Sequence, residues 1–440
     1  MGLDVDQELS PSLQQKLVCV GVLLKSFPQG EAAVQKLLEL AVGRKRLERL
    51  TERIGAERVR DREREVQHVE QLTLMDKIGG PADVIPPVAC AVMADGGRLQ
   101  YNVDNPDSKT HWHEYKAGLC LELGNREDPD DTTLPVGDPC PEVPAFLLDL
   151  GAMETLTREI HLQAAAVPES PAESTTAVDL QQINTIQELD AALSQLQAPA
   201  PPTTARALPW SPRVKRRDVV ATCGDCRELG RILMARAWHL GYFQAQRKAF
   251  VGDGGSWLWK LWAEAFQPFG FVAILDLMHA ITYVYAAATA GRPPSESGPV
   301  YRQWATWVWE GEVASVIAAV DRRQQEQGLP TESDGPTSPR SIVAATLTYL
   351  RNQQSRMNYP AYRRQGLPIT SSHMESTIKE LNYRIKGTEK FWSTEGGEDV
   401  LQLRADSLCN SDPLTAFWEH RATTRSGFHS ACRNKNKQAA

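Results

Sequence analysis

Apolar residues recur at helical spacing through the first 60 residues of the chain. The segments LQQKLVCVGVLLKSF (13–27) and GEAAVQKLLELA (30–41) each carry an apolar stripe, and the basic segment KRLERLTERIGAERV (45–59) follows a short break at 42–44. Such spacing predicts amphipathic helices. Two helices joined by a short glycine-containing turn, the second of them basic, also have the layout of a helix-turn-helix. We therefore predict an all-α, helix-turn-helix-like region over residues 1–80.

The basic residues of the second helix suggest a partner for this region. The side chains that would face the phosphates or bases of DNA, if it is a helix-turn-helix, are Arg44, Lys45, Arg46, Arg49 and Arg53. The same helix carries charges of both signs at i,i+4 spacing, which is typical of a solvated helix surface. The pattern alone leaves both interpretations open.

Strand-like patterning begins near residue 85. The segment VACAVMADGGRLQYNV (88–103) predicts a strand, a tight turn at Asp-Gly-Gly and a second strand, and HWHEYKAGLCLEL (111–123) predicts a third. Residues 85–123 are thus expected to form a three-stranded antiparallel meander. Residues 124–215 are acidic and rich in turn-forming residues, and they predict a partly flexible insertion with one short helix near 183–197.

Helices and strands alternate over residues 216–296. A long helix precedes the short strand KAFVGDG (248–254), and the helix SWLWKLWAEAF (256–266) precedes the buried strand FVAILD (271–276) and another helix. This alternation predicts parallel strands with helical crossovers. Residues 297–360 are expected to be a helical insertion, 361–410 to hold the last helices of the catalytic domain, and 411–440 to be a tail.

The longest apolar stretch, residues 271–290, is long enough to suggest a membrane span. Asp276 and His279 lie inside it, and a strand followed by an amphipathic helix explains it better. We therefore expect no membrane association. The eight cysteines are few and irregularly spaced, which favours a reducing cytosol.

The charge of the chain is unevenly distributed. The net charge is −7, but residues 104–200 alone carry 18 acidic and 4 basic residues. The remainder holds 44 basic and 37 acidic residues, so it is mildly basic. The overall acidity therefore does not exclude a nucleic acid as the partner.

Three carboxylates stand out by their positions. Asp95 follows the first predicted strand, Asp253 ends the fourth, and Glu375 lies in a basic, aromatic-rich helix over residues 371–387. The order of elements is that of the ribonuclease-H-like fold, in which the first and fourth strands are neighbours. Three hard oxygen ligands suit two Mg²⁺ or Mn²⁺ ions, which promote in-line displacement at phosphorus.

Each residue has a structural alternative. Asp95 alone would suit a hairpin turn, Asp253 a helix cap, and Glu375 a helix surface. For Asp276 we prefer the role of helix N-cap. The alternative is that Asp276, and not Asp253, binds the metal directly. His279 suits packing or hydrogen bonding near the site, because hard cations prefer oxygen ligands. The joint occurrence of the three carboxylates, in the order of the fold, favours the catalytic interpretation.

The segments around these residues resemble a DDE-type transposase of bacterial insertion sequences, in the broad Mutator-like group. The segment FVGDGGSW resembles the second catalytic segment of that group, and Asp276-Leu-Met-His279 resembles its [CD]-x-x-H signature. LPITSSHMESTIK (367–379) and the following YRIKGTEKFW resemble the segment of the third carboxylate. Asp95 and HWHEYKAG match the first carboxylate and a later strand. The resemblance covers about residues 85–410, without 124–215.

The resemblance implies DNA cleavage at transposon ends and strand transfer into target DNA, with no covalent protein–DNA intermediate. It implies double-stranded DNA as partner, namely terminal inverted repeats and target, bound by a homodimer or higher oligomer at the bacterial nucleoid. The phosphate contacts expected beside Glu375 are Lys379, Arg384, Lys386 and Lys390. The alternatives are a ribonuclease-H-like nuclease without joining activity, and a decayed or domesticated transposase that only binds DNA.

Overall fold

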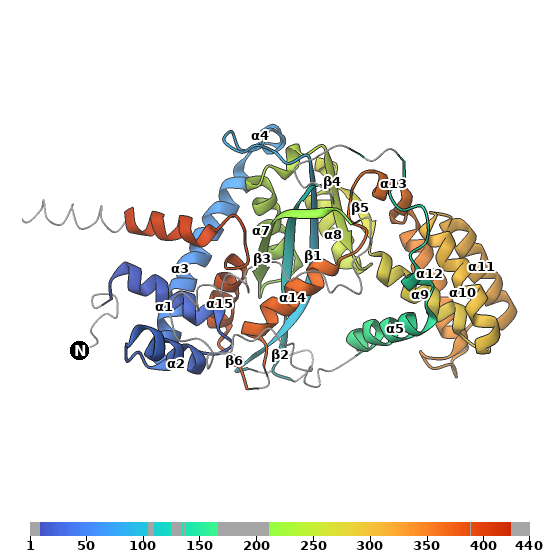
Figure 1. Cartoon of the computed structure of the whole chain (residues 1–440), viewed down its shortest axis with the longest axis horizontal. Helices are drawn as coiled ribbons and strands as arrows, with labels where there is room; N and C mark the ends of the chain where they lie inside the picture. Colours follow the sequence, from blue (N-terminus) through green and yellow to red (C-terminus); the bar gives the residue numbers. More distant parts are fainter. Residues whose placement is uncertain are drawn as a thin grey trace, which may run out of the picture.

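The computed structural model describes residues 9–103, 110–124, 134, 137–165, 211–387 and 389–423. Within them a mixed six-stranded sheet is flanked by helices, which confirms the expected α/β class (Figure 1). A second group of helices lies beside the sheet, on the right of the view. The described chain therefore consists of a sheet-centred part and a helical lobe.

The sheet has an antiparallel half and a parallel half. The strands β1 and β2 are antiparallel, β2 and β3 are antiparallel, and β1, β4 and β5 are mutually parallel neighbours in the order β3-β2-β1-β4-β5. The short strand β6 pairs with the end of β1. Their bounds are Ala89–Tyr101, Trp112–Gly124, Arg213–Thr222, Arg247–Gly252, Val272–Leu275 and Phe391–Trp392 for β1 to β6. The crossover helices are α7 (Cys226–His239) and α8 (Ser256–Ala265).

The turn predicted at Asp-Gly-Gly is wrong, because β1 is one continuous strand through these residues. Asp95 pairs with Ala117 and Gly97 pairs with Tyr115 on β2. A Cβ atom at Gly97 would lie 2.1 Å from the Tyr115 ring, which is fully buried. The glycine therefore makes room for a cross-strand aromatic ring. The turn was predicted from the local preference of Asp-Gly-Gly for turns, whereas packing across the strands determines the conformation here.

The three-stranded meander is present but interrupted. Its third strand is β3, which begins at Arg213, so residues 85–123 hold two strands and the acidic stretch separates them from the third. The described part of that stretch packs against the helical lobe, whereas a partly flexible insertion was predicted. The Tyr301 hydroxyl donates to Leu147 O at 2.6 Å, and Arg363 donates to the Asp138 carboxylate. The helix expected near 183–197 lies outside the described residues.

Residues 297–360, predicted to be helical, lie in the helical lobe, which also includes helices from outside this range. Its helices are α9 (Leu277–Thr289), α10 (Pro294–Trp309), α11 (Val313–Gln327), α12 (Pro339–Gln353) and α13 (Tyr359–Arg364), with η2 (Ala145–Leu148) and α5 (Leu150–Ala165) packed on them. The apolar stretch 271–290 forms β5 and α9. No helix among the described residues is both long and apolar enough to cross a membrane. The chain then returns to the sheet through α14 (Ser372–Ile385) and α15 (Thr394–Asp406).

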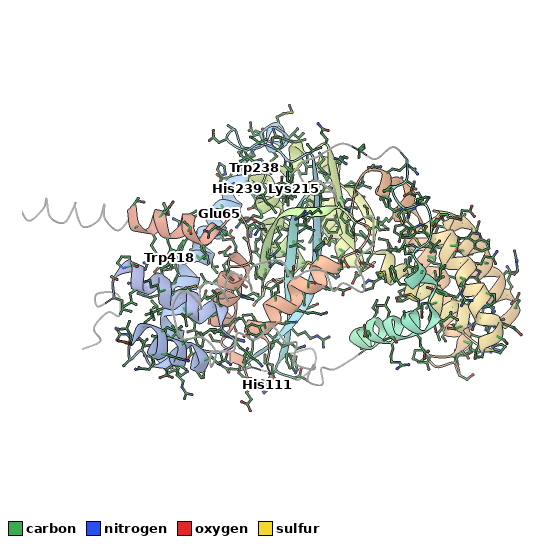
Figure 2. All side chains as sticks on the ribbon, in the orientation of Figure 1. Glu65, His111, Lys215, Trp238, His239 and Trp418 are labelled. Carbon is green, nitrogen blue, oxygen red and sulfur yellow. The ribbon has the colours of Figure 1, made fainter. Side chains whose placement is uncertain are left out.

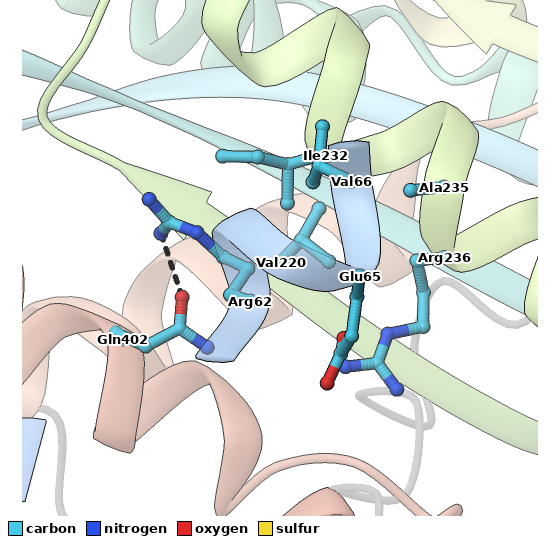
Figure 3. A pocket seen from close by; sticks show the side chains of 8 residues that line it. All are labelled: Arg62, Glu65, Val66, Val220, Ile232, Ala235, Arg236 and Gln402. Carbon is cyan, nitrogen blue, oxygen red and sulfur yellow. Dashed lines mark hydrogen bonds between the residues drawn. The ribbon is translucent and has the colours of Figure 1, made fainter. Parts of the chain in front are cut away.

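The N-terminal helices are joined to the sheet-centred part by buried ion pairs. They are α1 (Pro11–Leu23), α2 (Phe27–Leu38), α3 (Arg44–Gln71) and α4 (Leu74–Gly79), so the break predicted at 42–44 is found at residues 39–43. On α3, Arg58 lies 2.9 Å from Asp406 of α15, and both side chains are 1% exposed. Arg62 donates to Gln402 of α15 at 2.7 Å (Figure 3). Such pairs are costly to break, so this region belongs to the body of the protein.

The end of α7 holds a group whose ionisation opposes folding at acidic pH. Figure 2 shows Trp238 and His239 there. Burial, followed by the charges of Arg236 and His68, lowers the pKa of His239 from 6.5 to about 4. Between these values the unfolded chain binds a proton that the folded chain does not. Stability therefore falls as the pH falls through this window.

We expect His239 to lower the free energy of unfolding by about 3 kcal/mol between pH 7 and pH 4. Urea unfolding of the wild-type protein and His239→Gln across this range measures it, because the other groups titrate in both proteins. The variant should gain stability relative to the wild type as the pH is lowered. A difference between the two that is independent of pH would contradict the burial of a neutral imidazole at this position.

Candidate catalytic site

The strands β1 and β4 bring the first two predicted carboxylates together. Their parallel pairing ends at Met93 and Val251, and Asp95 and Asp253 each follow two residues later. The two aspartates therefore lie at the same level of the sheet, on adjacent strands. The expectation that the first and fourth strands are neighbours is confirmed, although Asp95 lies within its strand and does not end it.

Asp95 lies in the electrostatic field of the other candidate residues. Burial, together with the negative charges of Asp253 and Glu375, raises the pKa of its carboxyl to about 7. A hydrogen bond from Gly96 N to Oδ1, at 2.6 Å, and the charge of His279 act in the opposite direction. The three carboxylates and the imidazole are thus close enough to influence one another.

The loop that carries Asp253 is held from both sides. Gly255 N donates to Asp253 Oδ1 at 2.9 Å, just before α8 begins. From the helical lobe, the Tyr349 hydroxyl donates to the Asp253 carbonyl oxygen at 2.9 Å. Gly254 has a φ of +107°, and a Cβ atom there would lie 2.8 Å from the Tyr349 ring. The contact spans 96 residues of chain, so no local sequence signal indicated Tyr349.

Asp276 forms hydrogen bonds to three segments of the chain, namely α9, the start of α14 and the end of β4. It is the N-cap of α9, where Oδ1 accepts from His279 N at 3.0 Å, and Oδ2 accepts from both the backbone N–H and the hydroxyl of Ser371. Its own N–H donates to Gly252 O at 2.8 Å. The preferred N-cap role is therefore confirmed. Both carboxylate oxygens of Asp276 are therefore engaged in hydrogen bonds.

His279 places a positive charge beside the carboxylates. Its Nδ1 lies 3.4 Å from Asp276 Oδ1, a distance that suits an ion pair with the protonated ring. Burial lowers the pKa of His279, but Asp276 and then Asp253 and Glu375 raise it to about 9. The same interactions lower the pKa of Asp276 against the opposing effect of its burial. His279 therefore lies beside Asp276 near the site, and the contact is an ion pair, since its Nδ1 has no hydrogen-bond partner among the described residues.

Glu375 lies in the first turn of α14, where its side chain is exposed. A carboxylate is favoured there by the positive end of the helix dipole. Ser371, the N-cap of α14, is the residue that Asp276 holds. Asp276 therefore fixes the start of the helix that carries Glu375, and Ser371 is a functional neighbour that the sequence did not single out.

The donor set fits a hard divalent cation. Asp95 and Asp253 each use Oδ1 for a backbone N–H, and among the described residues their Oδ2 atoms have no hydrogen-bond partner. Three carboxylates are the ligands that Mg²⁺ and Mn²⁺ prefer. Within the described part of the chain, however, no three His, Cys, Asp or Glu side chains are grouped closely enough to hold a metal ion.

The basic residues predicted beside Glu375 have different surroundings. Lys379 is exposed on α14, one turn beyond Glu375. Lys386 is half-buried, with its Nζ 5.6 Å from the centre of the Trp112 ring. Lys390 Nζ donates to the carbonyl oxygens of Tyr383 and Arg384, at 3.2 and 3.0 Å. Lys379 is thus the member of the set best placed for a phosphate.

The prediction that Arg384 contacts DNA is wrong. Its side chain is 1% exposed, and Nε donates to Gly21 O at 2.8 Å. The guanidinium carbon lies 4.3 Å from the centre of the Phe27 ring and 5.1 Å from that of Trp392. Arg384 therefore joins α14 to the N-terminal helices. A basic residue in a charged helix gave no sign of this distant packing.

The basic residues at the start of α3 are partly accessible. Arg44, Lys45 and Arg49 are exposed, whereas Arg46 and Arg53 are half-buried. Lys45 pairs with Glu48 at 2.8 Å, as the solvated-surface interpretation expects. This end of α3 lies beside α2, away from the helical lobe (Figure 1). Both interpretations of this surface remain compatible with the positions of its side chains.

No protein-family model matches the chain, and no curated protein is significantly similar to it. Functional inference accordingly rests on the arrangement of Asp95, Asp253, Asp276, His279 and Glu375.

Proposed function

We propose that the protein is a DDE-type transposase with a ribonuclease-H-like catalytic domain, related to the broad Mutator-like group. It would cleave DNA at the terminal inverted repeats of a bacterial insertion sequence and join the freed ends to target DNA. In the first step a water oxygen attacks the phosphodiester and releases a 3′-hydroxyl. In the second, that hydroxyl attacks a target phosphodiester and displaces its 3′-oxygen.

The fold supports the proposal through the order of its strands. In a ribonuclease-H-like sheet the first three strands are antiparallel and the fourth and fifth lie parallel to the first. The order β3-β2-β1-β4-β5 has this arrangement. The position of α14 after the helical lobe also agrees with a late helix that brings the third carboxylate to the sheet.

One observation carries the proposal: Asp95 within β1 and Asp253 just after β4 lie at the same level of neighbouring strands, and the charge of Glu375 influences Asp95. Separate structural roles would not require three carboxylates, far apart in sequence, to influence one another electrostatically. Isolated buried carboxylates are costly, and their clustering is typical of a functional site.

The residues of the site have distinct tasks in this proposal. Asp95, Asp253 and Glu375 would hold two Mg²⁺ or Mn²⁺ ions, which supply charge stabilisation and an activated oxygen nucleophile during phosphoryl transfer. Asp276 orients the start of α14. Protonated His279 partly offsets the negative charge of the carboxylates. Lys379 is the side chain placed to contact a DNA phosphate.

Incubation of the full-length protein with DNA tests the proposal. The substrate is a duplex that ends in the inverted repeats flanking the coding sequence, mixed with a supercoiled target plasmid and Mg²⁺. We expect cleavage at the repeat end and joined products, neither of which forms with EDTA. A pre-cleaved duplex should still join, since it enters at the second step.

Other products would favour the other functions. Cleavage without joining, even from the pre-cleaved duplex, indicates a nuclease. Specific binding to the repeats without cleavage under any divalent cation indicates a protein that only binds DNA. Either result would contradict the transposase proposal.

A further inference from the structure

An open groove lies beside the candidate catalytic site. It has a volume of about 490 Å³ and is formed by α9, α12 and the loop after β4. Its walls include Gly254, Tyr283 and Tyr349. Nothing in the proposed roles of the carboxylates uses this space.

The groove is directly connected to the loop that carries Asp253. Gly254, the next residue, lines it. The hydroxyl of Tyr349, another lining residue, donates to the Asp253 carbonyl oxygen at 2.9 Å. The Tyr283 ring stacks on that of Tyr349, so it belongs to the same wall of the groove. A group in the groove would therefore lie next to a phosphodiester held at Asp253.

The chemistry of the walls suits a flat, uncharged ring. The rings of Tyr283 and Tyr349 are stacked, with centroids 3.9 Å apart and planes inclined by 12°. The outer part of the groove has the exposed residues Ala345, Thr348 and Asn352. Its lining residues, all within the described chain, include no charged side chain. Aromatic faces with a small polar rim are the means by which proteins hold unpaired bases of any sequence.

We infer that the groove binds an unpaired nucleobase adjacent to the phosphodiester that is cut. The inference rests on the proposed function for the identity of the phosphodiester. The base stacks with the tyrosine pair, while the carboxylate site contacts the backbone. Opening the duplex at the cleavage site would then be stabilised by the same residues that hold the Asp253 loop.

Binding of single-stranded DNA in EDTA tests the groove without any cleavage. The probes are a fluorescent oligothymidylate and an oligonucleotide of the same length whose sites are abasic, so both carry the same phosphate charge. Stacking of one base is expected to give the full-length protein about a 5- to 100-fold preference for the probe with bases. Tyr283→Ala should remove most of this preference.

A second variant avoids removal of a packed ring. Ala345→Leu adds bulk inside the groove at an exposed helix position, and it should lower the preference as Tyr283→Ala does. Ala318→Leu makes the same change at an exposed position of α11 outside the groove and should leave the preference intact. Trp418→Ala removes an aromatic ring far from the helical lobe (Figure 2) and serves as a control for general stacking.

The outcomes separate the groove from the catalytic assignment. Loss of base preference in Tyr283→Ala and Ala345→Leu supports the groove, even if Asp253→Asn were to retain cleavage. Equal affinity for both probes, or a preference that both groove variants retain, overturns the inference, even if the carboxylates prove essential for cleavage.

Discussion

Asp253→Asn is expected to lower the rate of DNA cleavage by about a thousandfold or more, with little change in DNA binding. The carboxamide keeps an oxygen that can accept from Gly255 N, so the loop before α8 should remain in place. It removes the negative charge that a divalent cation needs at this position. Single-turnover cleavage of the repeat-end duplex measures the rate, and fluorescence anisotropy in EDTA measures binding. The same loss is expected for Asp95→Asn and Glu375→Gln.

A matched substitution controls for the chemistry of the exchange. Asp225 is an exposed aspartate that caps α7 by accepting from Glu228 N at 2.8 Å. Asparagine caps helices as well as aspartate does, so Asp225→Asn should cleave DNA at the wild-type rate. Cleavage by Asp253→Asn at a rate near that of this control would remove Asp253 from the catalytic site.

Local sequence patterns predicted those elements whose structure depends on interactions between residues close together in the sequence. The strands and helices around Asp253 and Asp276 follow from apolar runs and a helix cap, and each is found where the pattern placed it. The strand β1 differs, because the conformation at Gly97 depends on the ring of Tyr115 across the sheet. A long-range pairing overrode a strong local turn signal there.

In the candidate site, too, some features could be predicted from the sequence and others could not. The order of elements along the chain predicted that the strands of Asp95 and Asp253 would be neighbours, as they are. The contacts that hold them could not be found in this way. Tyr349 reaches Asp253 from the helical lobe, and Arg363 fixes Asp138 and, with it, the described part of the acidic stretch. These contacts join segments about 100 to 225 residues apart, which no local pattern encodes.

Asp276→Ala is expected to lower the free energy of unfolding by about 3–5 kcal/mol, because it removes a buried, fully hydrogen-bonded carboxylate. The N–H and hydroxyl of Ser371 would lose their acceptor, and the charge of His279 would lose its partner. Ser371→Ala removes only the hydroxyl bond and should cost about 1 kcal/mol. Urea unfolding of the three proteins measures these differences. A loss for Asp276→Ala no larger than for Ser371→Ala would contradict a joining role for this carboxylate.

Asp276→Asn distinguishes positioning from metal binding. Asparagine keeps one acceptor oxygen, so the variant should fold while the start of α14, and with it Glu375, is held less firmly. If Asp276 acts through Glu375, the loss of cleavage should be smaller than in Asp253→Asn, and the Mg²⁺ concentration for half-maximal cleavage should rise only slightly, because all three carboxylate ligands are still present. If Asp276 were instead the second ligand, that concentration should rise and the loss should equal that of Asp253→Asn. Because both oxygens of Asp276 already accept hydrogen bonds, we expect the first result.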